Sequence, residues 1–351
     1  MKLLIITQKV DKNDPVLGFF HRWVEVFAEK YESIIVICLE KGEYSLPKHV
    51  TVISLGKEEG VSRLVYILRF YRYIISYRNS YSAVFVHMNQ EYILLGAMFW
   101  KMFKKGTILW RNHAQGNIMT RIAVWCSDIV LTTSPQSFTA RFKKTKMMPV
   151  GIDTSLFEPN LEVHKKPQSI LFLGRIAPVK NVDVFIEALK LLKNNGVVFT
   201  ATIAGSSLPR DAEYEHMLRK KVELYQLNKE INFTGSVTQS EARTLYHEHE
   251  IYVNLTPSGS LDKTIFESLA SGLVTVTANN FLKDVLPAGW FIGDIESAQC
   301  IADVLKNVLV QESPRNIKDI EGIAGFIEKH RLHSLTQELL ACSVAVSKEK
   351  Q

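Results

Sequence analysis

The chain contains little cysteine, and its four cysteines lie far apart. Cys38, Cys126, Cys300 and Cys342 form no C-x-x-C pair, the spacing typical of zinc and redox sites. Three of them stand within apolar patterns, which favours reduced and mostly buried thiols. We therefore expect neither a disulfide framework nor a metal site built on cysteine.

Long apolar runs are also absent. No stretch reaches the roughly 18 uninterrupted apolar residues that a membrane-spanning helix requires. The amino-terminal run LLII is too short for a signal peptide, and no small-residue cleavage site follows it. We therefore expect a cytoplasmic protein, either free or peripheral on the inner face of the membrane.

The signatures of several site types are missing. Neither first strand-to-helix turn contains G-x-G-x-x-G, which excludes a nicotinamide-dependent dehydrogenase. No Asp-x-Asp pair is present. His247 and His249 lack both the HExxH spacing and a third metal ligand. We assign these two histidines to solvent and expect no bound metal.

The length of 351 residues favours two domains, because one hydrophobic core rarely organises so long a chain. The net charge of +6 is unevenly placed, since residues 1–148 carry 21 Lys and Arg against 11 Asp and Glu. This excess indicates that the first half meets an anionic partner, either a membrane surface or phosphates. Nucleic acid is a poor partner, because acidic residues balance the basic ones elsewhere.

Short β-rich runs alternate with helix-period runs, which predicts an α/β fold with parallel sheets. The pattern breaks at residues 148–169, which hold three prolines, and we place an interdomain linker at 150–167. Strands are expected at 3–7, 33–39, 50–55, 83–87, 107–111 and 128–133 before it, and at 169–174, 197–205, 230–235, 250–255 and 273–278 after it. Helices are expected to begin near Leu17, Val61, Glu91 and Gly116, and to cover 181–194 and 211–226.

This alternation predicts a first domain over residues 1–149 and a second over 168–326, each a doubly wound sheet. Ligands of such sheets bind at the carboxyl ends of the strands, so we expect a cleft between the domains. The final helical segment, 327–351, falls after the second sheet is complete. It either caps the second domain or crosses back to the first.

Basic residues follow the first strand of the second domain. There the sequence GRIAPVKN places Gly174, Arg175 and Lys180 at the carboxyl edge of the sheet. The planar fork of arginine and the point charge of lysine suit a clamp on phosphate oxygens. The alternative is two solvated basic residues in a loop.

The stretch SGSLDKTIFESLASG follows the strand at 250–255 and begins a helix at the same edge. Free backbone N–H groups at a helix N-terminus make a pocket for anions. Glu267, one turn into this helix, suits a pair of ribose hydroxyls. Alternatively, Glu267 closes a capping box with Thr264.

Four motifs together resemble one family. LGRIAPVKN, PVGIDTSLF, FTGSV at 233–237 and PSGSLDKTIFESLASG look like the nucleotide-sugar half of glycosyltransferase family 4, retaining hexosyltransferases of the bacterial glycan-biosynthesis type. The motifs keep their order over residues 149–272, and the first half is compatible with the same family. The resemblance implies the GT-B fold, in which two Rossmann-like doubly wound domains face a central cleft.

The resemblance also implies roles for individual residues. Arg175 and Lys180 would bind the donor diphosphate, and Glu267 would hold the ribose. The family commonly has a second glutamate eight positions before this one, where the present chain has Gly259; Asp262 and Lys263 would contact the donor sugar instead. The remaining donor-binding positions would be Gly174, the backbone amides of Thr264 and Ile265, and Gly235 and Ser236 beside the nucleobase.

The first domain would supply the acceptor side and part of the reaction centre. Gly18, at the start of the first helix, would let the backbone come close to the donor. His113 stands just past the strand at 107–111 and would hydrogen-bond the transferring sugar, although a lone histidine is often structural. His87, also at a strand end, is a weaker candidate. The nucleotide sugar would be a substrate, and no metal or other cofactor is expected.

The segments 61–81 and 99–106 are basic and aromatic. In the first, Arg69, Arg72, Tyr73 and Ser76 share one side of a helical wheel, opposite Leu64, Leu68, Tyr71 and Ile75. Such a helix can lie in a bilayer interface, or it packs on its sheet with the arginines solvated. A lipid-linked acceptor would require the membrane, whereas a glycan acceptor would not.

Two other functions are compatible with this fold. One is a nucleotide-sugar epimerase, which needs acid and base carboxylates over the sugar. The other is a catalytically silent donor-binding subunit, against which the intact Arg175, Lys180 and Glu267 argue.

Overall fold

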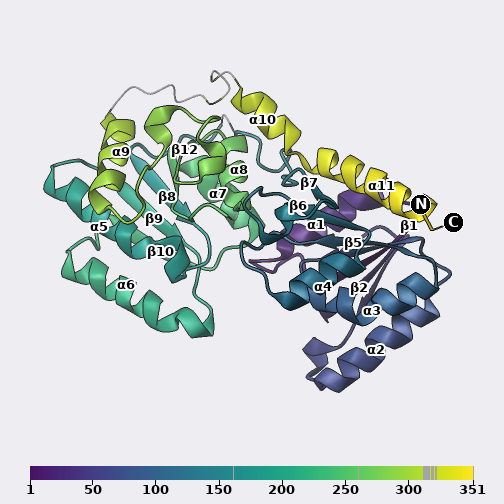
Figure 1. The fold of residues 1–351 in the computed structure, drawn as a ribbon. Coiled ribbons are helices and arrows are strands. Elements are labelled where there is room, and N and C mark those ends of the chain that lie inside the picture. The colour runs from purple at the N-terminus through teal and green to yellow at the C-terminus, as the bar shows by residue number, and fades with distance from the viewer. Residues whose placement is uncertain (161, 260, 311–316, 318–319, 321, 351) are drawn as a thin grey trace. The chain divides into compact units, whose positions relative to one another are not determined.

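The computed structural model describes residues 1–160, 162–259, 261–310, 317, 320 and 322–350. The chain divides into two compact units (Figure 1). Met1–Gly151 and Leu332–Gln351 make the first unit, and Ile152–Arg331 make the second. Residues 152–167, which we expected to be a linker, thus belong to the second unit.

The first unit is built on seven parallel strands in the order β3-β2-β1-β4-β5-β6-β7. Parallel strands require crossover connections, and helices supply most of them. The order reverses between β1 and β4, so ligands of a sheet of this type bind near their carboxyl ends. The strands are β1 (Lys2–Val10), β2 (Ser33–Lys41), β3 (Val50–Ser54), β4 (Ala83–His87), β5 (Gly106–Trp110), β6 (Ile129–Thr132) and β7 (Thr145–Met147).

Helices cover both faces of this sheet. Because side chains alternate along a strand, Leu3 and Ile5 of β1 enter the core cluster on one face, and Leu4 and Ile6 enter the cluster on the other. The first cluster includes side chains of α1 (Gly18–Ala28) and α11 (Leu332–Lys348). The second includes side chains of α2 (Arg63–Ser76), α3 (Gln90–Met102) and α4 (Ile118–Cys126).

Helix α11 comes from the far end of the sequence and packs on the first unit, against α1, β4 and β5. The hydroxyls of Tyr31 and Ser343 lie 2.9 Å apart, and Lys146 Nζ lies 2.5 Å from Glu338 Oε2. Leu335 and Leu339 are buried in the same core cluster as α1. The carboxyl-terminal helix is therefore part of the first unit's core.

The second unit has five parallel strands in the order β10-β9-β8-β11-β12. The order reverses between β8 and β11. The strands are β8 (Ser169–Leu173), β9 (Thr200–Ala204), β10 (Ile231–Gly235), β11 (Ile251–Asn254) and β12 (Val274–Thr277), and the helices are α5 (Val182–Asn194), α6 (Ala212–Leu224), α7 (Gln239–Glu248), α8 (Lys263–Ala270), α9 (Ala298–Val310) and α10 (Ile323–Lys329).

The predicted fold class is confirmed, because each unit is a doubly wound parallel α/β sheet. All eleven predicted strands are present, whereas β7 was not predicted. The helix predicted within 61–81 ends at Ser76. Among the described residues, no helix combines the length and the apolar character needed to span a bilayer.

Candidate functional site

Glycines mark the carboxyl edge of the second sheet. Gly205 follows β9 with φ of 136°, and a Cβ atom there would overlap the carbonyl oxygen of Gly174, which follows β8. Gly235 ends β10 with φ of 76°, and its own Cβ position is open space. Only glycine is unstrained at such dihedral angles, so no side chain covers the backbone at these positions. A ligand can therefore approach the main chain closely here.

The carboxylate of Asp262 lies at the switch between β8 and β11, where it accepts three hydrogen bonds at one oxygen. Its Oδ2 lies 2.6 Å from Lys180 Nζ, 2.5 Å from Thr256 Oγ1 and 2.9 Å from Asn254 Nδ2. Lys180 Nζ also donates to Thr256 Oγ1 at 3.0 Å. The sequence suggested a sugar contact for Asp262, and in the structure its Oδ2 is bonded to three protein donors.

The charge of Lys180 governs the ionisation of this carboxylate. Burial acts to raise the pKa of Asp262, but the Lys180 ammonium and the hydrogen-bond donors outweigh it, so the pKa is lowered. Asp262 is therefore ionised at neutral pH and fixes the ammonium at the carboxyl edge of β8. Arg175, two residues beyond β8, is exposed.

Helix α8 begins at Lys263 with Asp262 as its N-cap residue. Thr264 thus lies inside the helix, and its Oγ1 accepts a hydrogen bond of 2.6 Å from the Tyr252 hydroxyl. The capping box that we considered for Thr264 and Glu267 is therefore wrong. The backbone of Thr264 and Ile265 lies in the first turn, and the Ile265 N–H donates to Asp262 O at 3.2 Å.

Glu267 is buried, with 8% of its surface exposed, and its Oε2 accepts a hydrogen bond of 3.1 Å from the Tyr246 hydroxyl. Burial raises the pKa of Glu267 to about 7, although the positive charge of Lys263, one turn earlier, acts to lower it. Burial lowers the pKa of Lys263 to about 7, although the negative charge of Glu267 acts to raise it. Each charge thus opposes the effect of burial on its neighbour.

Ser236 lies beyond β10, and its hydroxyl oxygen lies 2.5 Å from that of Ser206, beyond β9. Ser236 was predicted from the sequence as a site residue, whereas four other residues of this site were not: Ser206, Asn254, Thr256 and Tyr246. Asn254 and Thr256 could have been found, because they lie at the end of the predicted strand 250–255 and just beyond it, before SGSLDKT. Ser260 of that motif lies outside the described residues.

Gly18 and His113 belong to the first unit. Gly18 is the first residue of α1, and its N–H donates to Asp14 O. His113 follows β5 and is exposed, and its Nδ1 accepts the backbone N–H of Gln115 at 3.0 Å. His87, in contrast, is buried, and its ring stacks on Phe20 with centroids 4.1 Å apart. His87 is therefore part of the core packing.

The assignment of His247 and His249 to solvent is wrong, because both are buried. His247 Nε2 hydrogen-bonds Glu158 O at 2.9 Å, and His249 bonds Leu245 O and the Thr202 hydroxyl at 2.8 Å. Each ring thus finds protein partners that the local sequence does not reveal. Within the described ranges, no group of three His, Cys, Asp or Glu is placed to hold a metal.

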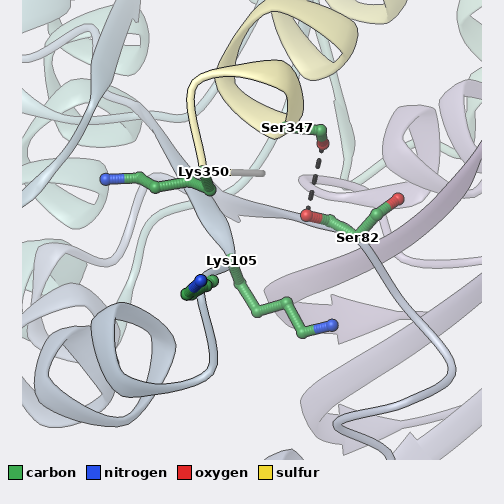
Figure 2. A pocket seen from close by; sticks show the side chains of 5 residues that line it. Ser82, Lys105, Ser347 and Lys350 are labelled. Carbon is green, nitrogen blue, oxygen red and sulfur yellow. Dashed lines mark hydrogen bonds between the residues drawn. The ribbon is translucent and has the colours of Figure 1, made fainter.

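A basic pocket of about 270 Å³ lies in the first unit, and Figure 2 shows its lining. Lys105 Nζ donates to Tyr81 O at 2.7 Å, and Lys350 Nζ lies 2.8 Å from Asp128 Oδ1. These groups precede β4, β5 and β6, so the pocket opens at the amino edge of the sheet. It is therefore separate from the carboxyl edge at which such sheets bind their ligands.

Residues 154–318 match the family model described as glycosyl transferases group 1. The match covers most of the second unit, including Lys180, Asp262 and Glu267. It does not extend into the first unit.

Two curated relatives are similar over part of the chain. WcaL of Escherichia coli K12, named as a colanic acid biosynthesis glycosyltransferase, is 24% identical over 190 residues, which are 51% of this chain and 44% of WcaL. The alpha-monoglucosyldiacylglycerol synthase of Streptococcus pneumoniae is 24% identical over 46% of this chain and 39% of its own length. The chain thus matches less than half the length of these relatives.

A solved structure is similar in fold over nearly the whole chain. The structure of Anabaena HepE in complex with UDP and glucose has a TM-score of 0.77 and covers 98% of this chain and 100% of HepE, at 16% identity. At this identity the likeness concerns the fold. The chain therefore has the fold of the GT-B glycosyltransferases, and its second unit is similar to the group 1 family.

Proposed function

We propose that this chain is a retaining glycosyltransferase of family 4 that moves a sugar from a nucleoside-diphosphate sugar to a glycan or a lipid-linked acceptor. The observation that carries the proposal is the cluster at the carboxyl edge of the second sheet. There Lys180, held 2.6 Å from Asp262, lies beside the start of α8, and Glu267 lies one turn further along that helix.

The leaving group sets the main chemical demand. When the bond between C1 of the sugar and the phosphate oxygen breaks, negative charge builds on the diphosphate, and cations and N–H groups lower the barrier by stabilising it. We assign this task to Lys180, Arg175 and the amides of Thr264 and Ile265. These groups supply the charge that a divalent cation supplies in other enzymes, so we propose that transfer needs no metal.

Retention follows if the acceptor enters on the face that the diphosphate leaves. The acceptor oxygen then bonds to C1 while the departing phosphate oxygen takes the acceptor proton, so atoms and charge balance without a protein nucleophile. His113 and the backbone at Gly18, both in the first unit, are proposed to contact the transferring sugar and the phosphate. Removal of water from the site would prevent hydrolysis of the donor.

Nucleoside recognition is assigned to the second unit. Glu267 would accept hydrogen bonds from the ribose hydroxyls, while Gly235 and Ser236 would contact the base. The complex of HepE with UDP and glucose supports a donor of this chemical class. We propose that Lys263, one turn before Glu267, contacts the donor sugar.

The relatives support two kinds of acceptor. WcaL is named for the biosynthesis of colanic acid and thus supports a role in polysaccharide biosynthesis, whereas the pneumococcal synthase is named for a glucosylated diacylglycerol. We propose that the acceptor is a growing glycan or a lipid-linked saccharide. A lipid-linked acceptor would require the protein to work as a peripheral protein at a membrane surface, on its inner face.

A donor panel tests the proposal. UDP- and GDP-sugars are added to the wild type, to Arg175→Ala and to Glu267→Ala, and the unfolding midpoint and donor hydrolysis are measured with and without EDTA. Lys306→Ala, on the exposed side of α9, is the control. We expect one donor class to raise the wild-type and control midpoints, but to have little effect on the other two variants.

Three results would contradict the proposal. The first is a wild type that responds to no nucleotide sugar, and the second is a pair of site variants that respond as the wild type does. The third is a donor that returns as its epimer with no transfer, which would favour the epimerase.

A further inference from the structure

Three neighbouring helices of the first unit leave large apolar side chains exposed. They are α2, α3 and α4, which cover one face of the sheet, α3 packing against both of the others (Figure 1). On α4, Trp125 is 79% exposed and Ile118 is 64% exposed. The remaining exposed apolar residues of these helices are Leu64, Ile67, Leu68, Ile75, Met98, Met102, Met119 and Ile122.

On each helix these residues form a stripe. On α4, Ile118, Ile122 and Trp125 follow the i, i+4, i+7 spacing of one helix face, while Ala123 and Val124 face the core. On α2, Leu64, Leu68 and Ile75 follow the i, i+4, i+11 spacing, and Phe70 and Ile74 are buried instead. We call the exposed apolar side chains of these three neighbouring helices the α2–α4 surface.

The exposure of this surface bears on the two interpretations of segment 61–81. The wheel opposed Leu64, Leu68 and Ile75 to the basic side, and packing on the sheet would have buried them. They are exposed, and Arg69 is engaged instead by Glu59 at 2.8 Å and by the carbonyl of Leu55. The apolar side of α2 therefore faces away from the core.

The charge on the helices of this surface is mostly positive. The sequences of α2, α3 and α4 contain a single acidic residue, Glu91, against five basic residues. Exposed basic residues in or beside these helices are Arg63, Arg72, Arg78, Lys101, Lys104, Arg121, Lys143 and Lys144. An occupant of this surface should therefore be both apolar and negatively charged.

An anionic bilayer surface meets both conditions. Its acyl region accepts apolar side chains, its headgroups attract Lys and Arg, and Trp favours the boundary between them. A second copy of the chain would bury the same apolar area, but it would bring like charges together. The charge pattern thus favours lipid over self-association.

We propose that the α2–α4 surface seats the first unit on an anionic membrane, with Trp125 of α4 as its principal apolar anchor. The proposal deepens the proposed function. It rests on that function for the reason why the protein would bind a membrane, since a lipid-linked acceptor has to be met there. Binding itself needs no donor and no catalysis.

Vesicle sedimentation tests it with the full chain. Vesicles of phosphatidylcholine alone and of phosphatidylcholine with phosphatidylglycerol are mixed with the wild type, with Trp125→Ser/Leu68→Ser, and with Arg72→Glu/Lys101→Glu. The control is Leu224→Ser/Val310→Ser, whose parent side chains are 78% and 68% exposed in the second unit. All substituted side chains are exposed, so the fold should persist, and circular dichroism checks that it does.

We expect the wild type and the control to bind the anionic vesicles and to release them at high salt. Each variant of the surface should bind at least about tenfold more weakly, which corresponds to about 1.4 kcal/mol. Equal binding to neutral vesicles, unchanged binding by the surface variants, or a dimer that Trp125→Ser/Leu68→Ser dissolves would overturn the proposal. Because donor-induced thermal shifts are measured without vesicles, a failure of either proposal is seen separately.

Discussion

The ammonium of Lys180 lies 2.6 Å from Oδ2 of Asp262, the N-cap residue of α8. The two side chains are 15% and 18% exposed, so the pair is largely shielded from water. Breaking a shielded pair by removing one partner leaves an uncompensated charge, which costs more than the pair contributes. Asp262 therefore positions the cation that we propose for the diphosphate.

The first prediction follows from this pair. Asp262→Asn keeps the size of the side chain but removes its charge, so the Lys180 ammonium is no longer held in place. We expect kcat/KM to fall by about 10- to 100-fold, which corresponds to about 1.4–3 kcal/mol. Steady-state assays measure it, with Asp303→Asn on the exposed side of α9 as the control. An unchanged kcat/KM would remove the positioning role.

A second prediction concerns the pH dependence of donor affinity. The pKa of Glu267 is raised to about 7, so a proton occupies the carboxylate below neutral pH and is lost above it. The ionised form offers both of its oxygens as acceptors to the ribose hydroxyls, whereas the protonated form carries a proton on one of them. Donor affinity should therefore rise between pH 6 and 8. Calorimetric titration checks this, and Glu267→Gln should bind weakly with no such rise; a rise that persists in Glu267→Gln would refute the assignment.

Acid should destabilise the second unit through His330. Burial, assisted by the charge of Lys329, lowers the pKa of His330 to about 4. The unfolded chain binds this proton near pH 6.5, so between pH 6.5 and 4 the unfolded state binds more protons. The free energy of unfolding then falls as the pH falls, by up to about 3 kcal/mol.

Unfolding curves at a series of pH values measure this effect. The loss should be smaller in His330→Leu than in the wild type. His333→Leu is the matched control, because His333 is exposed two residues past the end of the second unit. Identical pH profiles for the wild type and His330→Leu would mean that His330 is not the source.

A methyl group at Gly205 should damage the edge of the second sheet. It would overlap the Gly174 carbonyl oxygen at a backbone φ of 136°. We expect Gly205→Ala to lower the free energy of unfolding by at least about 2 kcal/mol and to weaken donor binding. Gly289→Ala, whose Cβ would meet nothing within 4 Å, should change stability by less than about 0.5 kcal/mol. Equal denaturation midpoints for the two variants would contradict this account.

Removing apolar volume from α11 should weaken the first unit. Leu339 has no exposed surface, so Leu339→Ala should cost about 2–5 kcal/mol. Hydrogen exchange should accelerate in β4 and β5, while β8 and β11 stay protected. Gln337→Ala, on the exposed side of the same helix, is the control. Faster exchange confined to the second unit would disprove the placement.

The strands were predictable because buried parallel strands form short apolar runs bounded by turn residues. Runs such as SILFL and IYVN need no distant information, and both became strands. The strand β7 was missed because TKM is three residues long and lies at the edge of its sheet. A strand of this length has no apolar run.

The site was predictable only in part, because its contacts join distant segments. Lys180 and Asp262 are 82 positions apart, and their meeting depends on β8 lying beside β11. The same reason explains the error at His247, whose carbonyl partner Glu158 is 89 positions away. Residue type and spacing identified the candidates, whereas strand order decided their partners.

The return of α11 to the first unit sets an order of assembly during synthesis. A ribosome completes Met1–Gly151 long before it reaches Leu332, so the apolar surface that Leu335 and Leu339 cover stays open while the second unit emerges. The second unit is continuous in sequence, and it can therefore finish folding first although it is made later. The first unit closes only after α11 has been made, and until then the apolar side chains that α11 covers stay exposed.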